Sequence, residues 1–102
     1  MSPPGRTQEQ RAHALEVAMR VRRERADLRR ALKGGTASPI TALDDERFRG
    51  VRVRWFLESL PGIGSSRAEL MMAELQIAPT RRLGGLSARQ RHALLARLDG
   101  RP

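Results

Sequence analysis

The sequence has no cysteine, one lysine and three aromatic residues among its 102 residues. The absence of cysteine excludes a disulfide framework, a thiolate zinc site and a cysteine nucleophile. No apolar run approaches the roughly 20 residues of a transmembrane helix, and the N-terminal residues lead into a polar segment without an apolar signal core. We therefore expect a cytoplasmic protein that does not associate with a membrane.

Aromatic and histidine side chains are too few to form a catalytic or stacking site. Phe56 fits an apolar stripe and is expected in the core, whereas Trp55 is expected to be partly exposed. Three aromatic residues cannot supply the row of platforms on which single-stranded nucleic acids stack. His13 and His92 lie far apart in the sequence without ligand partners, so we expect no catalytic role for them.

Negative charge is also scarce, because 20 lysine and arginine residues outnumber 11 acidic ones and leave a net charge of +9. All of these basic residues except Lys33 are arginine, whose planar fork of donors suits phosphate oxygens. The excess is spread along the whole chain. A polyanion, and nucleic acid before others, is the partner that this composition favours.

The first third of the chain predicts one long helix. Thr7 and Gln10 match a capping box, and no proline or glycine follows until the stop signal Gly34–Gly35. Residues 7–35 are therefore expected to form a long basic N-terminal helix. Its thin apolar stripe consists of Ala14, Val17, Val21, Leu28 and Leu32.

The other faces of this helix are charged and allow two interpretations. One is a solvated helix with exposed ion pairs at i,i+3 and i,i+4. The other is a basic arm that lies along DNA as a second contact surface. The residues of that surface would be Arg20, Arg22, Arg23 and Arg25. The excess of arginine alone does not distinguish the solvated helix from the DNA-binding arm.

Residues 36–50 are predicted to be a connector with one short helix, which Ser38 caps and Pro39 begins. The acidic run at residues 44–46 is expected to be a solvated turn. Neighbouring acids on a short helix diverge, and nothing nearby completes a ligand set. We therefore expect neither a metal nor a cofactor.

Two amphipathic helices are predicted after this connector, because apolar residues recur at i, i+3, i+4 and i+7. These residues are Val53, Phe56, Leu57 and Leu60 in the first helix, and Ala68, Met71, Met72 and Leu75 in the second. The sequence Leu-Pro-Gly-Ile-Gly at residues 60–64 separates them. It is typical of the hairpin in a helix-hairpin-helix DNA-binding motif.

The residue types in this hairpin suit a bound phosphate. Pro61 fixes the entry angle, and Ile63 is expected to point inward as an anchor. Gly62 and Gly64 are expected to supply unusual backbone torsions and close approach to a ligand. Their free N–H groups, with the N-terminus of the next helix, would make a compact anion site.

The first turn of that next helix adds polar side chains. Ser65 or Ser66 is expected to cap the helix or to donate to phosphate, and Arg67 adds a positive charge. The alternative is a tight helix-helix turn that is merely capped by serine.

A second turn separates these helices from the last one. Pro79 ends the second helix, Arg81 and Arg82 follow in the turn, and Ser87 caps the final helix. This extra turn is typical of a helix-two-turn-helix module. We therefore expect an all-α protein with a flexible segment at residues 1–6, the long helix, and a compact helix-two-turn-helix DNA-binding domain over residues 36–102.

Segments along nearly the whole chain resemble the actinobacterial integration host factors. The matching segments are Thr7–Arg11, Arg22–Ala26, Gly34–Gly35, Glu58–Gly64, Arg67–Ala68, Ile77–Leu83 and Gly85–Leu86. The resemblance implies a nucleoid protein that binds double-stranded DNA largely without sequence preference, bends or organises it, and assists phage integrases. It implies a monomer in solution, with integrase or other nucleoid proteins as further partners.

The resemblance also implies which residues touch DNA. It places phosphate contacts on the backbone of Gly62, Ile63 and Gly64 and on the side chains of Arg67, Arg81 and Arg82, and it matches Arg52 to a position that is commonly lysine. Two positions depart from the family pattern, as in a divergent paralogue. Ser65 replaces a usual lysine and Gly84 a usual basic residue, so the expected contact face loses charge. The candidates to compensate are Arg49, Arg54, Arg89 and Arg91.

RNA or ribosome binding is the main alternative function, since a related helix-two-turn-helix region occurs in a small-subunit ribosomal protein. A base-excision glycosylase would need a nucleophilic lysine or an N-terminal proline beside a base-sized pocket. Lys33 precedes a Gly-Gly break and Pro3 is not the first residue. We therefore predict no enzymatic activity.

Overall fold

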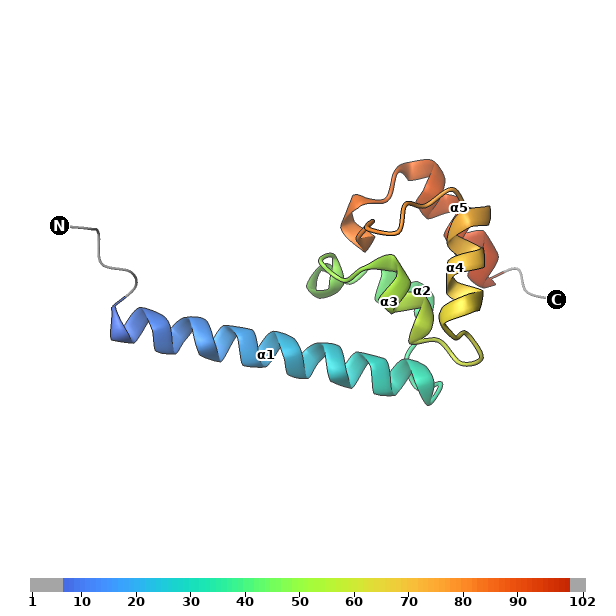
Figure 1. Ribbon diagram of the computed structural model, residues 1–102. Coiled ribbons are helices and arrows are strands. Elements are labelled where there is room, and N and C mark those ends of the chain that lie inside the picture. The colour runs from blue at the N-terminus through green and yellow to red at the C-terminus, as the bar shows by residue number, and fades with distance from the viewer. Residues whose placement is uncertain (1–6, 100–102) are drawn as a thin grey trace.

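The computed structural model describes residues 7–99, so the predicted flexible segment at residues 1–6 and the last three residues lie outside the described part (Figure 1). The described part contains five α-helices and two 3-10 turns, with no strand. They are α1 (Gln8–Lys33), α2 (Pro39–Leu43), η1 (Glu46–Phe48), α3 (Val53–Glu58), α4 (Ser65–Glu74), η2 (Leu83–Gly85) and α5 (Ala88–Asp99). The all-α prediction is confirmed.

The long helix begins and ends where the sequence predicts. The Thr7 hydroxyl accepts from the Gln10 backbone N–H at 3.1 Å, and the Gln10 side chain accepts from the Thr7 N–H at 2.8 Å. At the other end, Gly35 adopts a φ of 78°, which favours glycine. The N-terminal half of α1 extends away from the other helices (Figure 1). This arm makes the molecule elongated, with extents of 60 × 29 × 23 Å.

One hydrophobic core joins all the helices. The predicted apolar stripe of α3 is buried in the core, since Val53, Phe56 and Leu57 are inaccessible to solvent. Leu28 and Leu32 of α1 lie in the same core cluster, so the core crosses the division that the sequence suggests at residue 35. The N-terminal half of α1 extends beyond the domain, so its apolar residues Leu15 and Met19 remain exposed.

Polar contacts fix α1 against α3. The Arg29 guanidinium lies over the Trp55 ring, 4.7 Å from its centroid, and its Nε donates to the Ser59 hydroxyl at 2.9 Å. Ser59 is fully buried and donates in turn to the Trp55 carbonyl. Arg47 of η1 adds a longer ion pair to Glu24 of α1 at 3.8 Å.

The connector and the last helix close the domain. The Ser38 cap and Pro39 at the start of α2 are as predicted, and η1 is a further short turn that the sequence did not indicate. Ser87 and Gln90 form a second capping box at the start of α5. Arg91 of α5 pairs with Asp44 next to α2. Within the described residues no helix is long and apolar enough to cross a membrane.

Candidate nucleic-acid interface

The predicted hairpin forms between α3 and α4. Gly62 has a φ of 77°, in the region that favours glycine, so its expected unusual torsion is confirmed. Ile63 is partly buried and packs against the core as expected. Its backbone N–H donates to the Leu60 carbonyl at 3.3 Å, so the turn itself uses the N–H that the family resemblance assigns to phosphate.

Gly64 is the N-cap residue of α4 and has an extended backbone, with φ −95° and ψ −169°. The prediction of an unusual torsion is therefore wrong at this glycine. Among the described residues no side chain caps α4, so the capping role predicted for Ser65 or Ser66 is wrong, and the alternative that they donate to phosphate stays a prediction. The first N–H groups of α4 consequently have no acceptor among residues 7–99 and point out of the helix end. That arrangement, beside an exposed hairpin, attracts an anion.

The basic side chains around the hairpin differ in whether other residues bind them. Arg67 is exposed and makes no hydrogen bond or ion pair with the residues that the structure describes. Arg54 instead donates to the Ser65 hydroxyl at 2.6 Å and to Glu58 at 3.1 Å, and lies 3.6 Å from Glu69. Two carboxylates therefore neutralise Arg54, which weakens the prediction that it adds charge to the contact face.

A group of arginines gathers where the second turn meets the segment before α3. Arg52 and Arg82 are joined by an antiparallel bridge, with Val53 N–H donating to the Arg81 carbonyl and Leu83 N–H to the Val51 carbonyl. This pairing brings two segments about thirty residues apart side by side. It creates a shallow groove whose arginines are Arg49, Arg81 and Arg82, with Arg52 at its edge. We call these four residues the arginine groove.

Each side chain of the arginine groove donates to a backbone carbonyl and not to a carboxylate. Arg49 donates to Gly84, Arg52 to Thr80, Arg81 to Gly85 and Arg82 to Gly50, at 3.2, 3.3, 3.0 and 2.6 Å. In the part of the chain that the structure describes, no acidic residue lines the groove. A carbonyl orients a guanidinium without cancelling its charge, so the four arginines keep their positive charge in fixed positions.

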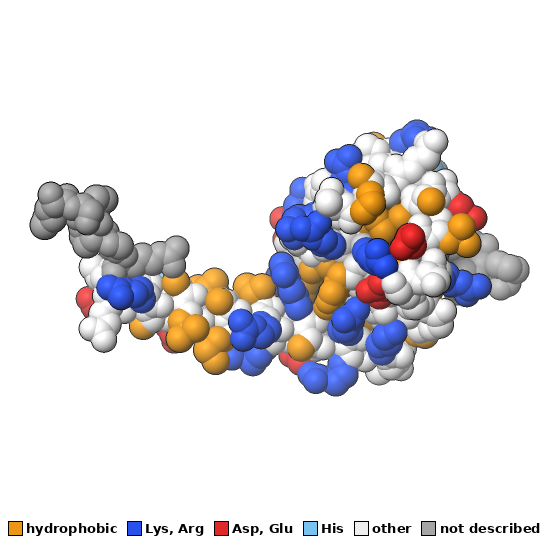
Figure 2. All heavy atoms as spheres, viewed as in Figure 1, with side chains coloured by type: hydrophobic (Ala, Val, Ile, Leu, Met, Phe, Trp, Pro, Cys, Tyr) orange, Lys and Arg blue, Asp and Glu red, His pale blue; other side chains and the backbone are white. Residues whose placement is uncertain are grey.

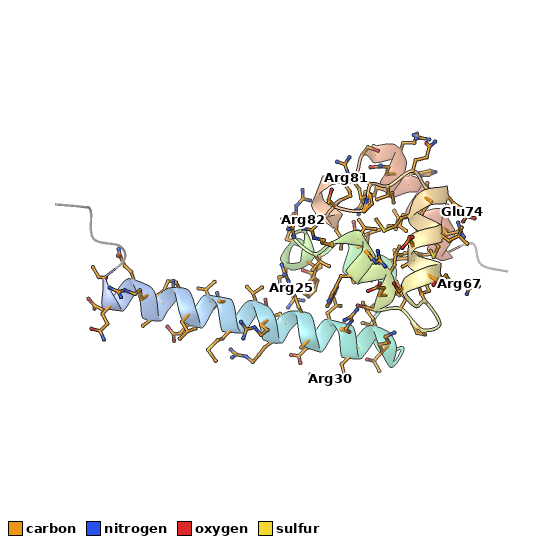
Figure 3. All side chains as sticks on the ribbon, viewed as in Figure 1. Arg25, Arg30, Arg67, Glu74, Arg81 and Arg82 are labelled. Atoms are coloured by element: carbon orange, nitrogen blue, oxygen red, sulfur yellow. The ribbon has the colours of Figure 1, made fainter. Side chains whose placement is uncertain are left out.

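The hairpin and the arginine groove are separate basic regions. Figure 3 shows Arg81 and Arg82 on the edge of the domain that faces the arm, whereas Arg67 lies on α4 at the opposite side. Figure 2 shows arginine side chains over both regions of the visible face, with acidic side chains between them. The structure therefore does not bring all the predicted contact residues into one cluster.

The predicted second surface on α1 is not a single surface. With 3.6 residues per turn, Arg22 and Arg25 share the side of α1 that packs on the domain, and both line a groove with Trp55. Arg20 and Arg23 fall on the far side and are exposed. Their sequence proximity therefore does not make the four arginines one contact face.

Four arginines were candidates to replace the positive charge missing at Ser65 and Gly84. Of these, only Arg49 belongs to the arginine groove. Arg89 donates to the Gln76 side chain, Arg91 pairs with Asp44, and Arg54 pairs with two acids. No local sequence signal distinguishes Arg49 from them, because its position depends on a contact with Gly84 thirty-five residues away. Among the described residues, no group of three acidic or histidine side chains is placed to hold a metal.

Comparisons with known proteins agree with this geometry. Residues 21–98 match the family described as "S13-like H2TH domain". The chain is 48% identical over 103 residues to a protein of Mycolicibacterium smegmatis named "Integration host factor", covering 97% of this chain and 98% of that protein. A protein of the same name from Mycobacterium tuberculosis is 48% identical over 99 residues, covering 93% and 94%. A solved structure described as "sIHF bound to an 8bp palindromic DNA" superposes with a TM-score of 0.76 at 34% identity, covering 81% of this chain and 98% of the other.

Proposed function

Because this chain belongs to the actinobacterial integration host factor family, we propose that it is a nucleoid-associated protein that binds double-stranded DNA with little sequence preference. The observation that carries the proposal is the arginine groove, in which four positioned guanidiniums form no ion pair with a carboxylate of the described residues. The solved structure that the chain resembles holds a DNA duplex, which supports DNA as the partner. Backbone phosphates carry no sequence information, so contacts of this kind position the protein without selecting a sequence.

The proposed contacts divide between the two basic regions. At the hairpin, the N-terminus of α4 would bind one phosphate through the N–H groups that follow Gly64, with Arg67 and Ser66 beside it. At the arginine groove, Arg52, Arg81 and Arg82 would bind phosphates through their side chains. Pro61, Gly62 and Ile63 would shape the hairpin rather than donate to DNA.

Two basic regions on one small domain also favour DNA bending. Phosphates drawn toward both regions would be pulled around the domain, and the added contacts would offset the cost of the bend. We accordingly propose that the protein organises the nucleoid, acts as a monomer free in solution, and assists site-specific integration through phage integrase or other nucleoid proteins. The name of the relatives supports the role in integration, and the presence of two separate basic regions supports bending.

Salt dependence tests the proposed phosphate contacts. Titration of unrelated duplexes at increasing salt should give a slope of log K against log salt between roughly −4 and −7, if about five to eight phosphates are neutralised. Arg81→Ala should weaken binding nearly equally on all sequences and reduce the magnitude of the slope by about 1. A shallow slope, or a loss confined to one sequence, would contradict the proposal.

RNA binding is a second candidate, which the description of the matching family as S13-like favours. A competition of duplex DNA against duplex RNA and structured RNA for the same labelled DNA distinguishes the two. We expect duplex DNA to compete best. More effective competition by RNA would replace the first proposal with the second.

We also propose that the protein has no glycosylase or nuclease activity. Lys33, the one lysine of the chain, lies exposed in the last turn of α1, directly before the Gly34–Gly35 break, and not in a base-sized pocket. Incubation with duplexes that contain uracil, an oxidised base or an abasic site should therefore release no product. Protein-dependent strand cleavage would refute this expectation.

A further inference from the structure

Three arginines from different parts of the chain meet around Gly50, where α1 passes the domain. Arg25 comes from α1, Arg49 follows η1, and Arg82 comes from the second turn. Figure 3 shows Arg25 and Arg82 on the same edge of the domain, with Arg25 reaching from α1 toward the segment before α3. We call Arg25, Arg49 and Arg82 the Gly50 corner.

Arg49 owes its place in the corner to Gly84. A β-carbon at Gly84 would lie 3.0 Å from the Arg49 β-carbon and 3.1 Å from its Nε. The missing side chain lets the two backbones approach, so that Gly84 N–H donates to the Arg49 carbonyl at 2.9 Å and the Arg49 guanidinium donates back to the Gly84 carbonyl. Asp44 and Glu46 lie on the other side of Arg49 but form no ion pair with it.

Arg25 reaches the corner without any acceptor of its own. Its terminal nitrogen lies 3.2 Å from the position that a β-carbon of Gly50 would occupy. The Gly50 carbonyl is already taken by Arg82 at 2.6 Å. The Arg25 Nε is buried, and among residues 7–99 it has no hydrogen-bond partner. The Arg25 guanidinium is therefore held in place by packing alone, and its N–H donors make no hydrogen bond to residues 7–99.

We propose that the Gly50 corner binds one stretch of DNA backbone, so that α1 and the domain contact the same phosphates instead of two separate duplexes. Three positive charges that lie around one glycine without an ion pair to a carboxylate repel one another. A bound phosphate relieves that repulsion and supplies the acceptors that Arg25 lacks. The inference rests on the proposed function, and it adds Arg25 and Arg49 to the residues that contact DNA.

The test compares four single variants of the full-length protein, each with one positive charge less. Arg25→Gln and Arg49→Gln remove corner residues. Arg97→Gln removes an arginine that pairs with Glu74 at 2.8 Å, and Arg20→Gln removes one from the far side of α1. Binding of a fluorescent 20-base-pair duplex is measured by anisotropy over a salt series.

Each corner variant should lower the affinity about 3- to 10-fold at moderate salt and reduce the magnitude of the slope of log K against log salt by about 0.9. The two controls should stay within about twofold of the unmodified protein, because their charges lie outside the contact. The double variant of Arg25 and Arg49 should lose less than the product of the single losses, since neighbours that share a phosphate are coupled.

A glycine pair checks how Arg49 is positioned. Gly84→Ala should displace Arg49 and lower the affinity as Arg49→Gln does. At Gly85 a β-carbon would make only an ordinary contact of 3.4 Å, with Arg81, so Gly85→Ala should cost less. Urea unfolding and the fluorescence of Trp55, which lies under Arg29 of α1, establish that each variant keeps its fold and its docked helix.

The outcomes separate this inference from the proposed function. If the unmodified protein shows no salt-dependent binding to duplex DNA, the proposed function fails and the corner fails with it. If the unmodified protein binds but Arg25→Gln and Arg49→Gln behave like Arg97→Gln and Arg20→Gln, only the corner is overturned.

Discussion

At the scale of single residues, the two hairpin glycines have different roles. Gly62 adopts a positive φ, so the turn itself requires glycine there. Gly64 has a backbone that any residue adopts, and a β-carbon at this position would meet no atom within 4 Å. The described structure therefore does not require glycine at position 64, which agrees with the proposal that a ligand approaches the backbone there.

This difference predicts opposite effects of substitution. Gly64→Val should leave the unfolding free energy within about 0.5 kcal/mol of the unmodified protein but weaken DNA binding severely, because the side chain blocks the helix N-terminus. Gly62→Ala should destabilise the fold by about 1 kcal/mol or more, because its φ is strained for alanine. Urea unfolding and anisotropy on the same samples measure both effects. Unchanged DNA affinity in Gly64→Val would exclude the hairpin as a contact.

Asp45 gives a prediction for acid conditions. Hydrogen bonds from the Arg47 side chain and backbone hold the pKa of its carboxyl below the usual value of 3.8. A lowered native pKa stabilises the fold above the unfolded pKa, and this contribution disappears as the pH falls through the native pKa. Asp45→Asn should therefore be slightly less stable than the unmodified protein at pH 7, and the difference should disappear as the pH falls through the lowered pKa of the Asp45 carboxyl. Urea unfolding across this range checks the sign, and a constant difference would contradict it.

At the scale of elements, caps and stop residues set most of the helix boundaries. The capping boxes at Thr7 and Ser87 and the serine cap of α2 lie where the sequence indicates them. α3 and α4 are the exceptions, because neither helix has a side-chain cap. α4 starts after Gly64, and its first N–H groups have no side-chain acceptor among the described residues. At α4 the uncapped end lies beside the exposed hairpin, which supports the proposal that it binds a phosphate.

The two capping boxes should contribute differently to stability. Ser87→Ala should lower the unfolding free energy by about 1 kcal/mol, because α5 is packed into the core. Thr7→Ala should reduce helix content at the end of the arm without lowering the melting temperature of the domain, because that end packs against nothing in the described structure. Circular dichroism at low temperature and through the melt distinguishes the two. An equal loss of melting temperature would show that the arm unfolds together with the domain.

At the scale of the whole molecule, α1 has two parts. Its second half contributes Leu28 and Leu32 to the core and is fixed by Arg29 over Trp55. Its first half extends from the domain and leaves Leu15 and Met19 exposed. The two halves belong to one continuous helix, so the arm is held at a defined angle to the domain.

Deletion of residues 2–20 should therefore leave a folded domain. We expect the melting temperature to change by less than about 4 °C, which corresponds to under about 1 kcal/mol for a domain of this size. Helical signal should fall only by the contribution of the removed helix. A large drop in melting temperature would show that the arm stabilises the domain through contacts beyond those at Leu28, Leu32 and Arg29.

The sequence by itself determined the helices, the hairpin and the basic character of the protein. These features depend on local rules: the period of apolar residues, the side chains that cap helix ends, and the glycine that a positive φ requires. The hairpin could be located for the same reason, because Pro61, Gly62 and Ile63 act within one turn.

Only the tertiary structure decided which arginines are free to meet a phosphate. Arg54 is neutralised by Glu69 of the next helix, Arg49 depends on the space over Gly84, and Arg25 meets Arg82 although fifty-seven residues separate them in sequence. A guanidinium loses or keeps its effective charge according to what lies within a few ångströms of it. That neighbourhood is set by packing between distant segments, which no local pattern of residues encodes.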